Sequence, residues 1–410
     1  MRVRPVKGHV SLDQEKKETS AFPQLSRAGA SVHIHCWITA ERSFLSDPIG
    51  AQGSARTEEC KVFPDVESFG GQQAWYLSPV GDGTPSIGCR PCGGGATGTG
   101  PCRQTPRGDC PAECDCPPTF PVAMYCDSRS LQHVPYIPSR IKYLYLQHNL
   151  ISSIPDGAFH NATGLVWIMM HQNNLSSDGV GKRAFAELGS LDRLYLYHNQ
   201  LSRVPANLPR SLRDLRLSHN HIARVPAASF SGMANLSVLL LNHNGIQDVS
   251  GALRALPALT LLDVSNNRLR KVPESLPGML HQLYLESNSI SALPGGFLDG
   301  FLKLQYVRFG HNLLTDRGIP PNTFNNSGLV ELDLSYNLLE HIPPVSTQLE
   351  HLYLQANRIK EFTLSSLCSR VDVVNFSHLK VLRLDGNALS REDLPNDAAL
   401  CLRLAATIEM

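Results

Sequence analysis

Apolar and polar positions alternate in one recurring pattern from residue 141 to the end of the chain. The pattern reads L-x-x-L-x-L-x-x-N-x-L, as in LRDLRLSHNHI, LHQLYLESNSI and LEHLYLQANRI. Apolar residues at every second position of the L-x-L segment predict a short strand whose leucines point to one side and whose other side chains point to the opposite side. One such strand cannot bury its leucines alone, so the pattern predicts a stack of strands.

An asparagine closes each copy of the pattern, and the spacing of these asparagines indicates the fold. They follow one another at intervals of 24, 26, 21, 24, 23, 21, 24, 25, 20 and 30 residues, within or near the roughly 20–29 residues of a leucine-rich repeat. We expect each asparagine to turn the chain out of its strand and to hydrogen-bond backbone groups of neighbouring coils. These framework asparagines are Asn149, Asn173, Asn199, Asn220, Asn244, Asn267, Asn288, Asn312, Asn337, Asn357 and Asn387.

The repeats predict an α/β leucine-rich-repeat solenoid, a horseshoe with short parallel β-strands on its concave face. Turns, 3-10 and extended segments are expected on the convex face. About a dozen strands, stacked roughly 4.7–4.9 Å apart, give a concave face on the order of 55 Å long. The segments are then a disordered stretch over 1–109, a cysteine-rich cap over 110–140, repeats over 141–367, and a long penultimate and terminal repeat with a C-terminal cap over 368–410.

Composition and charge exclude several classes of function. The 410-residue chain carries 37 Lys and Arg against 36 Asp and Glu, so no global charge draws it to nucleic acid or an anionic membrane. No run approaches the roughly 18 apolar residues of a membrane span. The motifs G-x-S-x-G, H-E-x-x-H and G-x-x-x-x-G-K-[ST] are absent, so we expect neither an enzyme nor a cofactor.

Six cysteines lie where a solenoid would expose its core, at its two ends. Four precede the first repeat in the spacing C-x3-C-x-C-x9-C, and two bracket the last repeat. A zinc site would favour paired C-x2-C units, whereas even numbers at each end favour disulfide caps over a metal or a reactive thiol. For the first four, the sequence leaves three pairings open. The cysteines are Cys110, Cys114, Cys116, Cys126, Cys368 and Cys401.

N-x-[ST] sequons are spread over the repeats and predict N-linked glycans on a secreted protein. The alternative for each is an unmodified surface asparagine. One of them, Asn174, directly follows a framework asparagine, so we expect it to be left without a glycan as readily as to carry one. The sequons begin at Asn161, Asn174, Asn235, Asn325 and Asn375.

The outward positions of the strands predict a binding surface on the concave face. Tyrosine and arginine recur there, and both are favoured in protein interfaces. The alternative is a solvated sheet with binding elsewhere. The central outward residues are Tyr145, Met169, Tyr195, Arg216, Leu240, Asp263, Tyr284, Arg308, Asp333, Tyr353 and Arg383, and Asp385 follows on the last of these strands.

Three histidines, His198, His219 and His243, fill the slot before the framework asparagine on three consecutive repeats. Such a row can share a zinc ion or sense pH. Solvated side chains at strand ends are the more frequent case, and we predict no metal site.

Residues 110–410 resemble the class II small leucine-rich proteoglycans nearly continuously. The resemblance rests on CDCPPTFPVAMYCDSRSL, IPSRIKYLYLQHN, VDVVNFSHLKVLRLDGN and DAALCLRLA, on the cap spacing, and on the 30-residue interval before the last framework asparagine. It implies the cap pairs Cys110–Cys116 and Cys114–Cys126. It also implies an extracellular matrix protein that binds fibrillar collagen, type I first among them, regulates fibril assembly, and carries N-linked chains that include keratan sulfate.

The resemblance transfers some sites and not others. Asn161, Asn235, Asn325 and Asn375 match acceptor positions of the family, whereas Asn174 has no counterpart and a further family acceptor falls on Gln200. A collagen-binding Glu-x-Lys follows the last framework asparagine in the family. Here that stretch is Asn387-Ala388-Leu389-Ser390, so the site is not carried over, and Arg383 and Asp385 remain on the same strand.

The N-terminal 109 residues depart from the family. They hold one tyrosine, Tyr76, where the family has an acidic, tyrosine-rich extension, and they hold five further cysteines. No apolar stretch of a secretory signal is visible near the start. We interpret this segment as an alternative or mispredicted first exon, and the protein as secreted into the matrix.

A second function fits the same surface. The concave face can sequester a growth factor of the TGF-beta type, as a soluble ligand trap, or pair with itself in a dimer. Deglycosylation separates the two readings, since collagen binding with a glycan contribution changes and a concave-face growth-factor complex changes much less.

Overall fold

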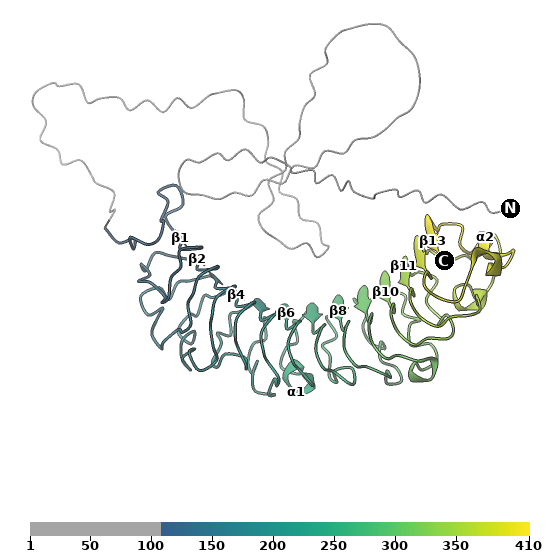
Figure 1. Cartoon of the computed structure of the whole chain (residues 1–410), viewed down its shortest axis with the longest axis horizontal. Coiled ribbons are helices and arrows are strands. Elements are labelled where there is room, and N and C mark those ends of the chain that lie inside the picture. Colours follow the sequence, from purple (N-terminus) through teal and green to yellow (C-terminus); the bar gives the residue numbers. More distant parts are fainter. Residues whose placement is uncertain (1–107) are drawn as a thin grey trace, which may run out of the picture. The chain divides into compact units, whose positions relative to one another are not determined.

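The structure is a computed structural model that describes residues 108–410, and they form one curved solenoid (Figure 1). Thirteen strands make a single sheet in which each strand pairs in parallel with the next along the chain. The predicted horseshoe is therefore confirmed. Residues 1–107 lie outside the described part, so the predictions for the N-terminal segment stay predictions.

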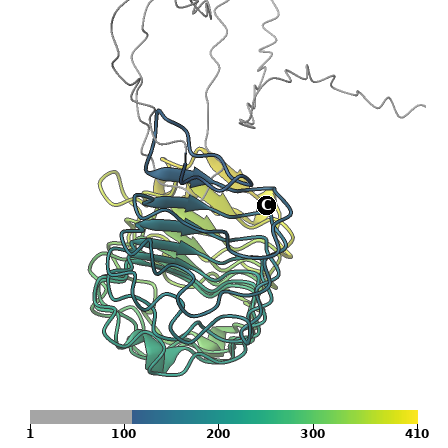
Figure 2. The same ribbon diagram turned by 90° about the vertical axis from the view of Figure 1, so that its left-hand side faces the viewer.

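Each strand spans three residues, and the strands stack one behind another along the arc (Figure 2). The eleven framework asparagines follow β2 to β12, and the two caps add β1 and β13, which completes the sheet at both ends. The strands are β1 (Ala123–Tyr125), β2 (Tyr143–Tyr145), β3 (Trp167–Met169), β4 (Arg193–Tyr195), β5 (Asp214–Arg216), β6 (Val238–Leu240), β7 (Leu261–Asp263), β8 (Gln282–Tyr284), β9 (Tyr306–Arg308), β10 (Glu331–Asp333), β11 (His351–Tyr353), β12 (Val381–Arg383) and β13 (Thr407–Glu409).

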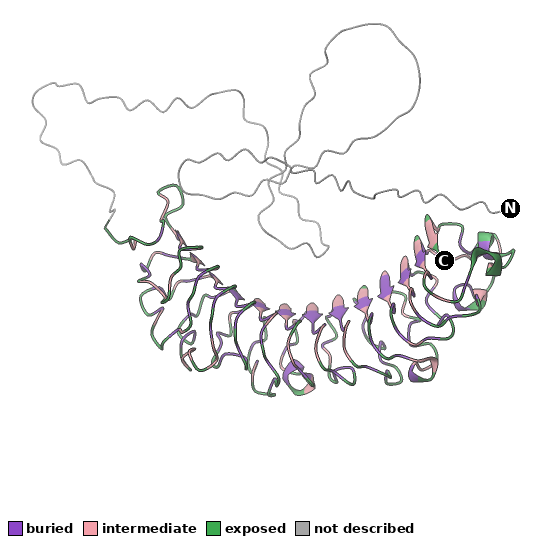
Figure 3. Cartoon of the chain, viewed as in Figure 1, coloured by how far each residue is buried: buried purple, intermediate pink, exposed green. Residues whose placement is uncertain are grey.

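The core runs through the inside of the solenoid, between the concave sheet and the convex connections (Figure 3). The middle residue of each strand points into it, and Leu144, Leu215 and Leu332, for example, are fully buried. Phe185 and Phe230 fill the convex side of the same core. Each coil therefore buries its leucines against its neighbours, as the pattern requires.

The convex connections are mostly turns with a few short helices. These are α1 (Ser250–Leu253), α2 (Ala398–Cys401) and the 3-10 helices η1 (Asp316–Gly318), η2 (Leu364–Ser366) and η3 (Arg391–Asp393). Because each coil has so little helix, the convex side stays thin and the sheet dominates the fold.

Each framework asparagine links its own coil to the preceding one, which confirms the predicted role. The Asn312 side-chain amide donates to Leu285 O (2.9 Å) and Phe309 O (3.0 Å), and its oxygen accepts from Ile290 N (3.0 Å). The residue before each of these asparagines has a left-handed backbone, as His311 does with φ of 55°. Histidine and asparagine are enriched among the residues that tolerate this conformation.

Disulfides close both ends of the solenoid. The N-terminal cap contains Cys110–Cys116 and Cys114–Cys126, the pairs that the resemblance implies. Cys368–Cys401 ties the segment before β12 to α2 behind it. In the chain-entropy description, closing that 33-residue separation restricts the unfolded chain by roughly 4 kcal/mol.

Candidate functional site

The predicted outward residues form one row along the concave face, because the register aligns them strand by strand. Three times in this row a tyrosine on one strand lies beside an arginine on the next: Tyr195 beside Arg216, Tyr284 beside Arg308, and Tyr353 beside Arg383. In the first two pairs the guanidinium covers the ring, at 4.3 Å and 4.8 Å from the ring centroid. The sequence showed these residue types but not their pairing.

The first pair is fixed by a carboxylate from the neighbouring outward position. Asp214 Oδ1 accepts from Arg216 Nε (3.2 Å), and Asp214 Oδ2 accepts from both Arg216 Nη2 (3.1 Å) and the Tyr195 hydroxyl (2.8 Å). Burial, together with the charge of Asp214, raises the pKa of Tyr195. The tyrosine thus remains a neutral donor, and both side chains are held in one orientation.

An aromatic patch lies toward the N-terminal end of the same face. Tyr125 stacks on Tyr145 with 4.6 Å between ring centroids, Trp167 meets the edge of Tyr195 at 5.5 Å, and Arg193 covers Trp167 at 4.9 Å. Burial raises the pKa of Tyr145 to about 12. This patch offers apolar ring surface to a partner.

The centre of the face holds four carboxyl groups around Arg308, which we call the central acidic cluster: Asp263, Glu286, Glu331 and Asp333. Arg308 Nε donates to Glu331 at 2.7 Å, and its Nη1 lies 3.9 Å from Glu286. Backbone N–H groups of Ser265 and Ser335 donate to Asp263 and Asp333. Gly310 keeps the space beside Asp333 open, since a Cβ there would lie 3.1 Å from its carboxylate.

Burial raises the pKa values of two acids of this cluster. Burial raises the pKa of Glu286 to about 8, with further contributions from the negative charges of Asp263 and Asp333. Burial also raises the pKa of Asp263, which is only 8% exposed. One oxygen of Glu286 is buried and has no hydrogen-bond partner in the described part of the chain.

The last arginine of the row is bound on both sides. Arg383 contacts Asp385 at 3.0 Å on its own coil and Glu409 of β13 at 2.7 Å. Asp214, Glu286, Glu331 and Glu409 were missed from the sequence. The signal for three of them was present in the other outward positions of each repeat, whereas Glu409 belongs to a strand that lacks the repeat pattern.

All five sequon asparagines are exposed, and they divide between the two edges of the sheet. Asn161, Asn235, Asn325 and Asn375 lie in loops that lead into β3, β6, β10 and β12, so they share the edge where strands start. Asn174 lies after β3, on the edge where strands end. The Asn375 amide donates to Asp372 at 2.6 Å.

The three histidines of the predicted row stack face to face at the strand-end edge. The ring centroids of His198, His219 and His243 lie 4.0 Å apart at interplanar angles of 12°. A metal lies in the plane of each imidazole that binds it, so rings in parallel planes cannot share one. Among residues 108–410, no group of three or more His, Cys, Asp or Glu could hold a metal ion. Burial and the two neighbouring imidazoles lower the pKa of His219 to about 4.

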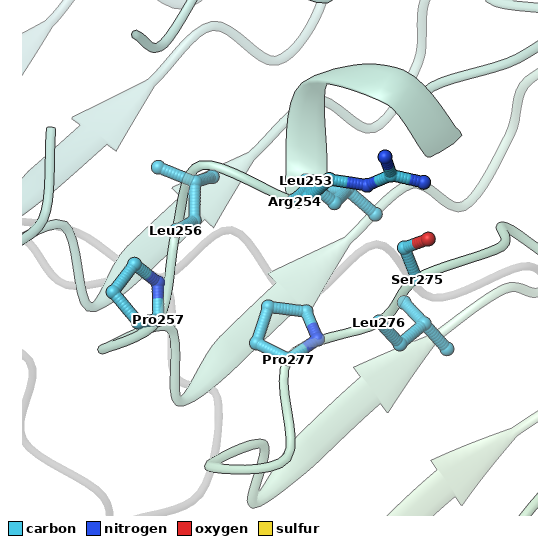
Figure 4. A pocket seen from close by; sticks show the side chains of 7 residues that line it. All are labelled: Leu253, Arg254, Leu256, Pro257, Ser275, Leu276 and Pro277. Carbon is cyan, nitrogen blue, oxygen red and sulfur yellow. The ribbon is translucent and has the colours of Figure 1, made fainter. Parts of the chain in front are cut away.

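Two shallow depressions lie away from the concave row. The larger, about 360 Å³, is on the convex side beside α1, and it is lined by Leu253, Arg254, Leu256, Pro257, Ser275, Leu276 and Pro277 (Figure 4). Its single charged side chain and apolar wall offer no acid–base pair. The other, about 290 Å³, lies at the strand-end edge beside the stacked histidines. No helix in the described part is long and apolar enough to cross a membrane.

Protein-family models match the repeats and the N-terminal cap separately. A model described as leucine rich repeat matches residues 139–201 and 210–269, and one described as leucine rich repeat N-terminal domain matches 109–138. A solved octameric complex of Latrophilin 3, Unc5D and FLRT2 (LRR) contains a chain with the same architecture. That chain matches with a TM-score of 0.57 and 28% identity, over 73% of this chain and 83% of its own.

Proteins of one family match over almost the whole horseshoe. Fibromodulin of Bos taurus is 58% identical over 76% of this chain and 82% of its own length, and fibromodulin of Homo sapiens is 57% identical over the same shares. Lumican of Homo sapiens is 43% identical over 74% of this chain and 89% of its own length. These relatives are secreted extracellular matrix proteoglycans, not enzymes. The chain belongs to the class II small leucine-rich proteoglycans of the extracellular matrix, and within them it resembles fibromodulin.

Proposed function

We propose that the protein is secreted, binds fibrillar collagen through its concave face, and so regulates the assembly of collagen fibrils. Type I collagen is the first candidate. The observation that carries the proposal is the row of tyrosine–arginine pairs, in which carboxylates hold the arginines in fixed orientations.

A long row suits a rod-shaped partner better than a small ligand. Collagen is a stiff triple helix of proline-rich chains without side-chain bulk at every third residue. Aromatic surfaces such as Tyr145 and Trp167 are the kind that receive proline-rich segments. Because the row is braced before binding, little conformational entropy is lost when the partner docks.

The central acidic cluster adds electrostatic recognition. Besides Glu286, whose raised pKa keeps it largely neutral near pH 7, three carboxyl groups lie around one guanidinium. This part of the face can therefore accept a lysine or arginine of the partner through charge-assisted hydrogen bonds. We therefore place the main contact at Arg308, held over the buried ring of Tyr284, rather than at the last coil, where Ala388 and Ser390 replace the charges of the family's collagen-binding stretch.

The proposed glycans lie on the edge of the sheet that carries their sequons. We propose N-linked chains, keratan sulfate among them, on Asn161, Asn235, Asn325 and Asn375. All four are exposed at the strand-start edge, so bulky chains there leave the row of tyrosines and arginines accessible.

Binding of the secreted full-length chain to type I collagen fibrils on a biosensor tests the proposal. We expect saturable binding that Tyr284→Ala with Arg308→Ala weakens at least about tenfold, as for truncation of interface anchors. The matched control is Arg210→Ala with Leu302→Ala, both exposed outside the concave row.

A third variant, Arg383→Ala with Asp385→Ala, measures what the terminal coil contributes. If correctly disulfide-bonded protein does not bind collagen, the proposal is wrong. Binding of a TGF-beta-type growth factor in that case would favour the soluble ligand trap.

A further inference from the structure

The strand-end edge carries exposed basic side chains on two coils, those that follow β5 and β7, with Gly245 of the β6 coil between them. Backbone hydrogen bonds hold these coils in register: His221 N donates to Leu201 O, Gly245 N to Ile222 O, and Arg268 N to Ile246 O, at 2.8–2.9 Å. Side chains in the same slot of successive coils are therefore roughly 5 Å apart. We call His221, Arg224, Arg268 and Arg270 the cationic edge patch.

The arginines of this patch are available to a ligand. Arg224, Arg268 and Arg270 are exposed and form no hydrogen bond or ion pair with any residue of the described part. Two acids nearby already form ion pairs, Asp178 with Arg203 and Glu274 with Lys271, both at 2.6 Å. Asp248 accepts from the Ser250 hydroxyl at 2.6 Å and is the one exposed carboxylate on the coil between Arg224 and Arg270.

The patch borders a real depression rather than a flat surface. His221, Gly245 and Arg268 share the same slot on three successive coils, and the missing side chain of Gly245 opens a gap between the other two. The gap belongs to the depression of about 290 Å³, which Asn220, Asn244 and Gln247 also line. It therefore places the Arg268 guanidinium and the exposed Gln247 amide beside His221, whereas the amides of Asn220 and Asn244 already donate to backbone carbonyls.

The stacked histidines border the patch toward the concave face. Burial and the neighbouring rings lower the pKa of His219 to about 4, so the middle ring is uncharged at neutral pH. The permanent charge of the edge is carried by the arginines, which stay protonated at every physiological pH. A ligand that matches them must be anionic at every such pH as well.

We propose that the cationic edge patch binds a sulfated polysaccharide chain. Sulfate esters are permanently charged, as the guanidinium groups are, and forked donors suit their oxygens. A linear chain laid across the coils from β5 to β7 can place successive sulfates against Arg224, Arg268 and Arg270, with one group in the Gly245 gap. The matrix in which this family acts is the setting for such a ligand.

The test uses the full-length secreted chain, with its N-glycans removed by enzyme so that they do not compete. The probe is an immobilised heparin-derived oligosaccharide at about physiological ionic strength. We expect saturable binding that falls as salt rises and is lost with the fully desulfated oligosaccharide. Arg224→Gln, Arg268→Gln and Arg270→Gln together should weaken binding by about tenfold or more, because each removes charge-assisted hydrogen bonds.

A matched triple variant separates a site from general charge. Arg210→Gln, Arg254→Gln and Lys303→Gln also remove three exposed cations without ion pairs in the described part, but away from the patch. They should leave the affinity within about twofold. Equal weakening by both variants, or no binding by the wild type, would overturn the proposal. Collagen binding by the first variant should be unchanged, so the two proposals fail independently.

Discussion

The central acidic cluster should make the stability of the horseshoe depend on pH through Glu286. In the unfolded chain this carboxyl group ionises near its ordinary pKa of 4.5, whereas in the folded protein burial raises its pKa to about 8. Between these values the unfolded state releases a proton that the folded state retains. The free energy of unfolding therefore falls as the pH rises from 4.5 to 8, and the loss is complete above pH 8.

The size of the effect follows from the same two values. Each pH unit in this interval removes about 1.4 kcal/mol, so up to roughly 3 kcal/mol is lost at neutral pH. Because the side chain keeps 21% exposure and Arg308 lies 3.9 Å away, we expect the measured loss to be about 1–3 kcal/mol. Glu286→Gln keeps the size of the side chain without its ionisation, so it should raise the free energy of unfolding at neutral pH by this amount.

Urea unfolding at about pH 5, 7 and 9, followed by circular dichroism, measures the difference. The two proteins should be nearly equally stable at the lowest pH and diverge as the pH rises. Glu361→Gln is the control, because this glutamate is exposed and forms no hydrogen bond or ion pair in the described part. Parallel stability curves for wild type and Glu286→Gln would refute the argument that Glu286 is buried as a neutral acid.

Three further predictions concern the framework, the C-terminal cap and the glycans. Asn312→Ala removes an amide that bonds two coils, so it should lower the free energy of unfolding by about 2–4 kcal/mol in urea titrations. Replacing Cys368 and Cys401 by Ala should lower it by roughly 4 kcal/mol, and a calorimetric Tm should fall with it. Peptide mass spectrometry of secreted protein should show a glycan on Asn235, whereas Asn174 should be unmodified because it directly follows the framework asparagine. Glycans on both would contradict the last prediction.

The repeat pattern was sufficient to predict the coils because every strand has to meet the same physical requirement. Buried leucines and the closing asparagine must recur wherever a coil packs on its neighbour, and β2 to β12 lie where the pattern occurs. The pattern did not predict the first and last strands, Ala123–Tyr125 and Thr407–Glu409. Each of these strands pairs with one neighbour only and needs no closing asparagine. An edge strand forms because it covers the open end of the solenoid, and its own sequence lacks the repeat pattern that would predict it.

The site was predicted less completely because its order depends on side chains from neighbouring coils. The row of tyrosines and arginines was visible in one outward position. The carboxylates that orient them occupy another outward position: Asp214 lies 2 residues from Arg216 on the same strand and 19 residues from Tyr195, and Glu331 lies 23 residues from Arg308. Their effect exists only once the register is known. The raised pKa of Glu286 likewise arises from three coils that meet at one place.

The two edges of the sheet give the solenoid separate surfaces, and Asn174 shows how they could interfere. It shares the strand-end edge with His221, two coils away in the same slot, while the other four sequons lie on the opposite edge. A glycan on Asn174 would project beside the cationic edge patch, and a sulfated one would compete there for the same arginines. An unmodified Asn174 leaves that edge free for a chain carried by another molecule. Occupancy of this one sequon therefore decides whether the patch faces an external ligand or the protein's own glycan.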